Sequence, residues 1–387
     1  MITTLTPAQL RARHTMKWTR MPADVLPMWV AEMDVETCPE VAAAVRDAAA
    51  REVFGYPTYD GRLQDATAQW CARRYSWDVD PDRVIELPEV LTGVRVAIEQ
   101  LTLPGSPVIL PVPAYPPFFA VLDVTGRRGV LVPMLAHTED DGTSGYRFDL
   151  QAIEEAFAAG AGSIVVCNPY NPLGAVFPAE HLAAVCALAE RYGARVISDE
   201  IHATLVYDRR HLPTAAVSET AAAVTVTITA ASKGFNTPGL KSAQLILNNE
   251  ADARAWTKTN RLRFAGASTL GTEAAIAAYT HGEPWLDELL TFLAARRDRL
   301  EEALPAILPG LRMSHPAATY LAWLDFRDVA QLGGDDPSAW LLREARVFLN
   351  PGPTFGAVGA GHARLNFATS PELVEDFLAR VAGAVRA

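Results

Sequence analysis

Cysteine is scarce in this sequence, and its spacing excludes two kinds of stabilisation. Only 4 of the 387 residues are cysteines, and none forms a C-x-x-C pair. A disulfide framework or a structural zinc site needs cysteines at short, regular spacings. The histidines likewise show no metal-ligand spacing, so we expect no metal site. We interpret Cys38, Cys71, Cys167 and Cys186 as small buried hydrophobic residues in a reducing compartment.

Long apolar runs and an excess of basic residues are also missing. No apolar run approaches the roughly 20 residues that cross a bilayer, and the opening MITTLTPAQLRARHTMKW lacks the apolar core of a secretory signal. The net charge is −11 at pH 7. Nucleic acids and anionic membranes attract clustered Lys and Arg, which this composition does not favour. We therefore expect a cytoplasmic protein that binds neither nucleic acid nor membranes.

What is present is an alternation of short apolar runs with helical patterns, from about residue 60 to 250. The runs include PVILPVP, GSIVVCNP, ARVISDEI and AVTVTITAAS, and the helical patterns include GVRVAIEQLTL and PAEHLAAVCALAERYG. This alternation predicts an α/β fold, with a mostly parallel sheet covered by helices on both faces.

The pattern changes from about residue 275, which indicates a second domain. The amphipathic helix EPWLDELLTFLAARRDRLEEAL, the strand TYLAWLDF, which we interpret as alternating, and the closing helix PELVEDFLARVAGAV predict a smaller α+β domain. A chain of this length favours two domains. We place an N-terminal segment that joins the small domain at residues 1–45, a large domain at 46–275 and the small C-terminal domain at 276–387.

Polar or aromatic side chains follow four of the predicted strands. They are Tyr115 after PVILPVP, Asn171 after SIVVC, Asp199 and His202 after ARVIS, and Ser232 with Lys233 after TVTIT. Ligands of parallel α/β sheets bind beyond the carboxyl ends of the strands. A single lysine at such a place would be interpreted as a side chain that reaches solvent. Four such strand ends together indicate one pocket.

These motifs carry a resemblance to a known family. The order FGY, PAY, NPxNPxG, SDEIH, SK and ARLNFA resembles that of fold-type I pyridoxal 5'-phosphate (PLP) enzymes, the aspartate aminotransferase superfamily. Within it, LPMWVAEMD, VFGYPTYDG, SKGFNTPGLK and TYLAWLDF are most similar to the MalY/PatB group of cystathionine and cysteine-S-conjugate β-lyases. The resemblance runs from about residue 20 to the C-terminus. It implies a large domain whose mostly parallel seven-stranded sheet lies between helices, plus a smaller α+β domain.

The resemblance implies a role for each strand-end residue. Lys233 would form the Schiff base with the cofactor, and a buried amine that loses its proton readily suits this task. Asp199 would keep the pyridine nitrogen protonated, although a carboxylate there could also cap a helix. Asn171 would bond the phenolic oxygen of the ring, and His202 stands where many relatives have a tyrosine with the same contact. Tyr115 would stack on the ring, with core packing as the alternative.

The phosphate of the cofactor would lie at LPEVLTG, before the helix GVRVAIEQ. Val90 and Leu91 would offer backbone N–H groups and Ser232 a hydroxyl. Lys241 stands where many aminotransferases carry a phosphate-binding arginine, unless it is a solvated surface lysine. Glu89 is unfavourable there, because a carboxylate repels a phosphate dianion unless it points away.

Further residues would bind the substrate or join two subunits. Arg364 in ARLNFA matches the arginine that binds the substrate carboxylate, beside Asn171, although a surface ion pair is the alternative. We expect Tyr320 and Trp29 at the substrate mouth, with core packing as the other interpretation of Trp29. Tyr56 in FGY matches a residue that reaches the phosphate of the neighbouring subunit, which implies a homodimer.

The reaction itself stays open at this stage. Similarity to the subgroup favours a C–S β-lyase, in which Lys233 takes the α-proton and the substrate yields a thiol, pyruvate and ammonia. An aminotransferase, or a specialised PLP enzyme acting on a cysteinyl conjugate of a larger metabolite, is the alternative. Some proteins of this group bind a transcriptional regulator, but a binding role alone has no need of Lys233, Asp199 and Arg364 together.

Overall fold

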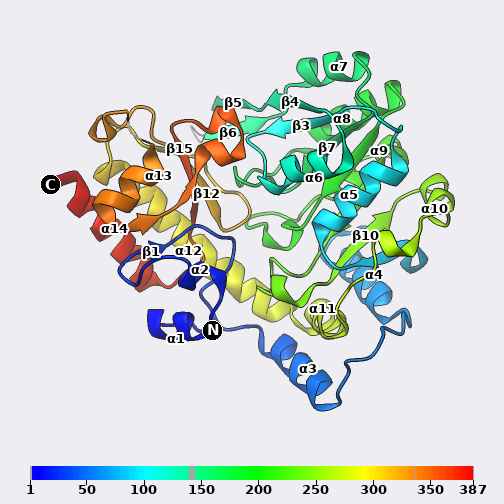
Figure 1. Cartoon of the computed structure of the whole chain (residues 1–387), viewed down its shortest axis with the longest axis horizontal. Helices are drawn as coiled ribbons and strands as arrows, with labels where there is room; N and C mark the ends of the chain where they lie inside the picture. The colour runs from blue at the N-terminus through cyan, green and yellow to red at the C-terminus, as the bar shows by residue number, and fades with distance from the viewer. Residues whose placement is uncertain (1, 139–143, 335, 387) are drawn as a thin grey trace.

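A seven-stranded sheet forms the centre of the larger part of the molecule (Figure 1). The computed structural model describes residues 2–138, 144–334 and 336–386. The strand order is β2-β10-β9-β8-β7-β3-β4; β10 runs antiparallel to both neighbours, and the other pairs are parallel. The strands are β2 Val84–Leu87, β3 Val108–Val112, β4 Gly129–Pro133, β7 Ser163–Cys167, β8 Arg195–Asp199, β9 Thr225–Thr229 and β10 Ala243–Leu247. This architecture confirms the predicted α/β class and the mostly parallel seven-stranded sheet.

Helices cover the sheet, which explains why its central strands are apolar throughout. Every residue of β3, β7 and β10 is buried, as expected when both faces of a parallel sheet are packed. The helices of this part are α3 Pro39–Ala50, α4 Arg62–Tyr75, α5 Val90–Leu101, α6 Pro117–Thr125, α7 Leu150–Ala158, α8 Ala179–Arg191, α9 Glu219–Val224, α10 Glu250–Trp256 and α11 Thr269–His281. A hairpin of β5 Leu135–Thr138 and β6 Ser144–Arg147 follows β4.

The smaller part combines a four-stranded antiparallel sheet with two long helices and a short one. Its strand order is β11-β12-β15-β14, formed by Arg312–Met313, Leu321–Asp325, His362–Asn366 and Asn350–Pro351. The helices are α12 Glu283–Ile307, α13 Pro337–Trp340 and α14 Pro371–Arg386. Of the helices in the described residues, none is both long and apolar enough to cross a membrane.

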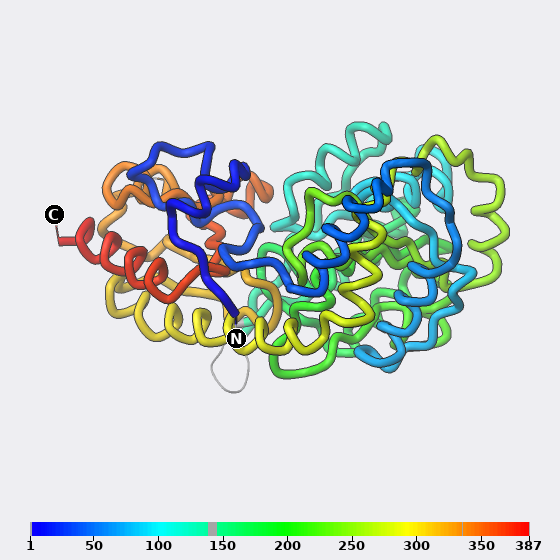
Figure 2. Tube along the Cα trace, turned by 90° about the horizontal axis from the view of Figure 1, so that it is seen from below, coloured from blue at the N-terminus to red at the C-terminus, as the bar shows by residue number. Residues whose placement is uncertain are grey.

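The N-terminal segment packs on the smaller part, as Figure 2 shows for the blue and red ends of the trace. It contains α1 Pro7–Ala12, α2 Met16–Thr19 and β1 Leu26–Pro27, and β1 pairs in parallel with β13 Val347–Phe348. Leu10 and Trp18 belong to the same buried cluster as α12 and α14. The domain boundaries at residues 45 and 275 stay a prediction.

One strand differs from its predicted pattern. We interpreted TYLAWLDF as an alternating strand, but all five residues of β12 are buried. Trp323 packs with Phe355 in the hydrophobic core around the large sheet. Ala322 and Leu324 belong to the hydrophobic core around α12. Because β12 lies between two hydrophobic cores, both of its faces are covered.

The predicted burial of the cysteines is confirmed. Cys38, Cys71, Cys167 and Cys186 are buried and carry free thiols.

Candidate active site

Most of the residues predicted for the site line one cavity, of about 160 Å³. It lies beyond the carboxyl ends of β3, β7, β8 and β9, where the chemistry of a parallel α/β fold is expected. The predicted residues in its wall are Val90, Leu91, Tyr115, Asn171, Asp199, His202, Ser232, Lys233 and Lys241. The fold therefore brings together residues that are up to 151 positions apart, from Val90 to Lys241.

The Lys233 amine faces the cavity from the turn after β9. Its Nζ donates a hydrogen bond to the carbonyl oxygen of Ala31 at 3.0 Å. Burial, reinforced by the nearby charge of Arg364, lowers the pKa of Lys233 to about 8, against the opposing effect of acidic neighbours. A substantial fraction of this amine is consequently neutral near pH 8, which a nucleophile or a general base requires.

Asp199 lies at the end of β8, and its carboxylate is deeply buried. Its Oδ1 accepts a hydrogen bond from the backbone N–H of Ile201 at 3.0 Å. Burial raises the pKa of Asp199 to about 7, although the Ile201 bond opposes this shift. Among the described residues, no Lys, Arg or His forms an ion pair with Asp199. A ligand with a protonated ring nitrogen would supply the missing positive charge.

Arg364 on β15 contacts the wall of the cavity from the smaller part, through the lining residue Asn171. Its Nη1 donates to Asn171 Oδ1 at 3.0 Å and its Nη2 donates to the carbonyl oxygen of Trp29 at 2.9 Å. Nε has no hydrogen-bond partner among the described residues, although only 2% of the side chain is exposed. Burial lowers the pKa of Arg364 to about 10. A buried guanidinium bonded only to neutral oxygens favours a carboxylate ligand.

His202 and Tyr115 border the cavity as neutral side chains. His202 is buried, and its Nδ1 has no hydrogen-bond partner among the described residues. Burial holds the pKa of His202 well below its usual range, and the charges of Lys233 and Arg364 act in the same direction. The imidazole is therefore neutral and can donate or accept one hydrogen bond from a ligand. The Tyr115 ring meets Phe118 edge to face, with centroids 5.6 Å apart.

The end of the cavity predicted for the phosphate is formed by the start of α5. Val90 and Leu91 are its first residues, and the side chain of Glu89 does not cap the helix. Glu89 instead accepts a hydrogen bond from Lys241 Nζ at 2.6 Å. The first N–H groups of α5, with the Ser232 side chain nearby, thus face a place suited to an anion.

Four predicted residues, Arg364 among them, lie outside the wall of this cavity. Tyr320 is buried, and its hydroxyl donates to the carbonyl oxygen of Ala31 at 3.0 Å. The Trp29 ring packs on Phe348, with centroids 5.5 Å apart, and contributes its carbonyl rather than its ring to Arg364. Tyr56 is 98% exposed and borders a separate surface hollow.

Comparison with known proteins shows the family to which this chain belongs. The model of aminotransferase class I and II matches residues 23–381. The chain belongs to this family. Cystathionine beta-lyase of Corynebacterium glutamicum is 45% identical to it over 97% of both chains, and cystathionine beta-lyase PatB of Bacillus subtilis is 33% identical over 94% of this chain and 93% of PatB. A Corynebacterium diphtheriae structure, provisionally assigned as a PLP-dependent beta-cystathionase, superposes with a TM-score of 0.93 at 44% identity, over the full length of both chains.

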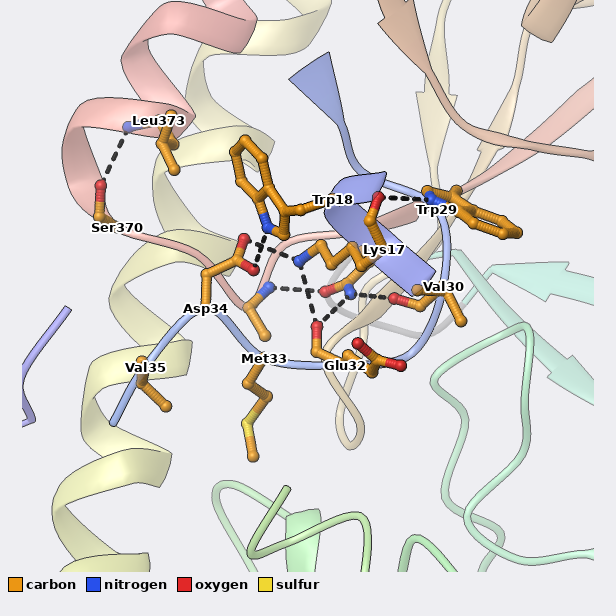
Figure 3. Close-up of polar contacts among 12 residues, drawn as sticks. Lys17, Trp18, Trp29, Val30, Glu32, Met33, Asp34, Val35, Ser370 and Leu373 are labelled. Atoms are coloured by element: carbon orange, nitrogen blue, oxygen red, sulfur yellow. Dashed lines mark hydrogen bonds and ion pairs between the residues drawn. The ribbon is translucent and has the colours of Figure 1, made fainter. Parts of the chain in front are cut away.

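This member of the aminotransferase class I and II family also holds its site with residues that we did not predict. Figure 3 shows the segment from Trp29 to Val35, which Lys17 and Trp18 of α2 hold as a clamp. Lys17 Nζ donates to Asp34 Oδ2 at 2.7 Å and to the Glu32 carbonyl at 3.1 Å, and Trp18 Nε1 donates to Asp34 Oδ1 at 2.7 Å. This clamp holds the segment whose Trp29 and Ala31 carbonyl oxygens bond Arg364 and Lys233. An acid directly after an apolar run, as in LPMWVAEMD, was the signal that could have revealed it.

A second unpredicted group is the buried hydrogen-bond network of Glu200, the residue after Asp199. Glu200 accepts hydrogen bonds from Ser198 Oγ at 2.8 Å and from Thr214 N at 2.9 Å, and its other oxygen lies 2.7 Å from His211 Nε2. All of these side chains are buried. Glu200 therefore anchors the turn after β8 to the segment around residue 211, and the sequence shows only an acid beside Asp199.

Proposed function

We propose that this chain binds PLP in the cavity and catalyses C–S β-elimination from cystathionine or related cysteine S-conjugates. The observation that carries the proposal is the buried Arg364 guanidinium, bonded to neutral oxygens, next to a lysine amine with a lowered pKa. Together they suit an α-amino acid, whose carboxylate needs the arginine and whose α-proton needs a base. The 45% identity to a cystathionine beta-lyase supports the same reaction.

The residues of the cavity fit PLP. The Lys233 amine can bond its aldehyde carbon, and the buried Asp199 can hold its ring nitrogen protonated. The unpartnered Nδ1 of His202 has room for one more hydrogen bond. The start of α5, together with Ser232 and Lys241, suits a phosphate. We therefore propose the predicted cofactor and substrate roles for these residues, including Asn171, Tyr115, Val90 and Leu91. The predicted substrate roles of Tyr320 and Trp29, which lie outside the cavity wall, belong to the same proposal.

The chain's own groups then explain the steps. When bound, PLP supplies an electron-withdrawing ring that accepts the electron pair released at the substrate Cα. Arg364 and Asn171 hold the substrate carboxylate and so orient the Cα–H bond. The Lys233 amine takes the α-proton and, as an ammonium, can return a proton to the departing sulfur. The Cβ–S bond breaks to release the thiol, and the remaining three-carbon enamine hydrolyses to pyruvate and ammonia.

The side chains that line the cavity help to distinguish elimination from transamination, the alternative reaction. An aminotransferase for dicarboxylic acids would need a second cation to bind the distal carboxylate. The described residues that line the cavity include Lys233 and Lys241 but no arginine, and Arg364, which bonds the lining residue Asn171, serves the α-carboxylate. Since Lys233 serves the reacting carbon and Lys241 lies at the start of α5, the described cavity favours elimination over transamination of a dicarboxylic acid.

We also propose that the active unit is a cytoplasmic homodimer in which Tyr56 reaches the neighbouring site. Tyr56, Phe54 and Leu262 are 98%, 67% and 86% exposed, an unusual concentration of large hydrophobic side chains on a surface. A second copy would remove them from water. The three-part division at residues 45 and 275 belongs to the same proposal, with the cavity lined by residues of the large part and by Ala31 of the N-terminal segment.

The deciding experiment measures pyruvate and free thiol from L-cystathionine and from S-alkyl cysteines, with purified, PLP-loaded protein. The proposal expects the two products in equal amounts, and neither from Lys233→Ala. Binding of the amino acid without pyruvate would mean that transamination, or a larger cysteinyl conjugate, is the true chemistry. A cellular phenotype that survives in Lys233→Ala would point to a regulatory binding role instead.

A further inference from the structure

An ion pair occupies the end of the cavity where the cofactor phosphate would bind. Lys241 Nζ lies 2.6 Å from Glu89 Oε2, and both residues line the cavity beside Val90, Leu91 and Ser232. Lys233 is the other lysine among the described lining residues, and its amine serves the opposite end of the cofactor. Lys241 is therefore the cation on which the phosphate depends within the described wall of this chain.

The two residues of the pair are held at the backbone, whereas their side chains can turn. Lys241 follows the turn Pro238–Leu240 with φ of 54°, and its carbonyl accepts a hydrogen bond from Ser268 N at 3.0 Å. The carbonyl of Glu89 accepts a bond from Gly93 N at 3.3 Å, which fixes Glu89 at the start of α5. The Lys241 and Glu89 side chains are 51% and 46% exposed. The pair can consequently open without any movement of the fold.

A carboxylate at this place acts against phosphate binding in two ways. It repels the phosphate dianion, which the N–H groups at the start of α5 attract. It also holds the ammonium group that the phosphate would bond. Glu89 does not compensate by capping α5, because its side chain makes no hydrogen bond to the first turn.

We propose that Glu89 competes with the cofactor phosphate for Lys241, so that this chain binds PLP weakly and exchanges it with the free pool. The inference rests on the proposed PLP function and extends it to cofactor retention. Glu89 is thus a residue that weakens cofactor affinity and takes no part in the reaction steps. The opposite role, in which Glu89 only holds Lys241 in position for the phosphate, predicts the opposite effect of its removal.

The test compares PLP affinity in the cofactor-stripped full chain, by quenching of tryptophan fluorescence. Glu89→Gln removes the charge at nearly constant shape and is expected to bind PLP more tightly by up to about fivefold, the upper end of the range for an exposed charge pair. Glu89→Asp keeps the charge and is expected to show no such gain. Lys241→Gln is expected to bind PLP about tenfold more weakly. Pyridoxal, which lacks the phosphate, should bind the wild type and Glu89→Gln equally.

Each outcome separates the inference from the proposed function. Unchanged or weaker PLP binding by Glu89→Gln overturns the inference, as does an equal gain for pyridoxal. A wild type that binds no PLP at all overturns the proposed function itself. The unfolding midpoint of each stripped variant controls for folding, and Glu89→Ser carries the same comparison if Glu89→Gln does not fold.

Discussion

Single side chains in and beside the cavity have protonation states and unpaired charges that favour a bound ligand and destabilise the protein without one. Lys233 loses affinity for its proton and Asp199 gains it, both because burial disfavours the charged form. Arg364 keeps a buried charge with only neutral acceptors around it. Such arrangements cost stability and are typical of functional sites, where the ligand supplies the missing partner.

The lowered pKa of Lys233 predicts that this residue lowers the free energy of unfolding of the cofactor-free protein, by an amount that depends on pH. Its pKa is about 8 when folded, against an ordinary value of 10.5. The unfolded chain therefore binds the proton more tightly, so the cost is complete below pH 8 and fades as the pH rises towards 10.5. Replacement by Met should stabilise the fold at pH 7 by about 1–3 kcal/mol more than at pH 10. Urea unfolding of both proteins at both pH values measures this, and an equal gain at both would contradict it.

Arg364 predicts a loss in substrate binding. Arg364→Lys keeps the charge but replaces the planar two-point contact with a single flexible ammonium. We expect kcat/KM for L-cystathionine to fall about 10²-fold, with a raised KM, as for the loss of a charged hydrogen bond. The same substitution at Arg299, which pairs with Glu375 on the surface, is the matched control and should leave both constants unchanged. Steady-state kinetics that showed equal effects at the two positions would refute this role.

Among the elements, the N-terminal segment and α5 decide the geometry of the cavity. The segment from Trp29 to Val35 carries no catalytic side chain, yet its carbonyl groups bond Lys233, Tyr320 and Arg364. Helix α5 lies so close to the sheet that a Cβ on Gly93 would come within 2.7 Å of Leu87 and 2.8 Å of Ile228. A glycine there lets the first turn of α5 reach the cavity.

The clamp under the N-terminal segment predicts a large effect on stability. Lys17→Met leaves the buried Asp34 carboxylate without its cation, which should lower the free energy of unfolding by about 3–5 kcal/mol. The exposed Lys258→Met is the control, expected within about 0.5 kcal/mol of wild type. In Lys17→Met/Asp34→Asn the loss should be smaller than the sum of the two single losses, because no lone charge remains. Urea unfolding measures all four variants, and additive losses would argue against a coupled pair.

At the scale of the whole molecule, the proposed dimer completes the site. Tyr56 does not line the cavity of its own chain, where it is 98% exposed beside Phe54 and a hollow containing Tyr59 and Arg261. A two-fold dimer uses the same patch on both subunits. Such a patch could cover the half-exposed Lys241 and Glu89 of the neighbouring chain, which a lone subunit leaves open to water.

Subunit complementation tests this arrangement. Tyr56→Ala and Lys233→Ala, each alone, should have little lyase activity. Co-expressed, they form mixed dimers in which one site combines an intact Lys233 with an intact Tyr56 from the other chain. Random pairing then restores about a quarter of wild-type activity. Two co-expressed copies of the same variant are the control, and no recovery in the mixture would mean that Tyr56 acts within its own chain or not at all.

The amino-acid sequence by itself determined four strands of a mostly parallel sheet and the reactive residues at their ends. Alternating apolar runs and the turn residues that follow them are local properties, so Lys233 after β9 and Asp199 at the end of β8 could be located without coordinates. The same holds for Arg364 within ARLNFA, a motif of short range.

Only the tertiary structure decided the contacts between distant segments. The bond from Lys233 to Ala31 spans 202 positions, that from Arg364 to Asn171 spans 193, and that from Lys241 to Glu89 spans 152. No local pattern encodes such pairs, because they depend on how the two cores pack around the cavity. For the same reason β12 looked half-exposed in sequence, whereas a hydrophobic core covers each of its faces.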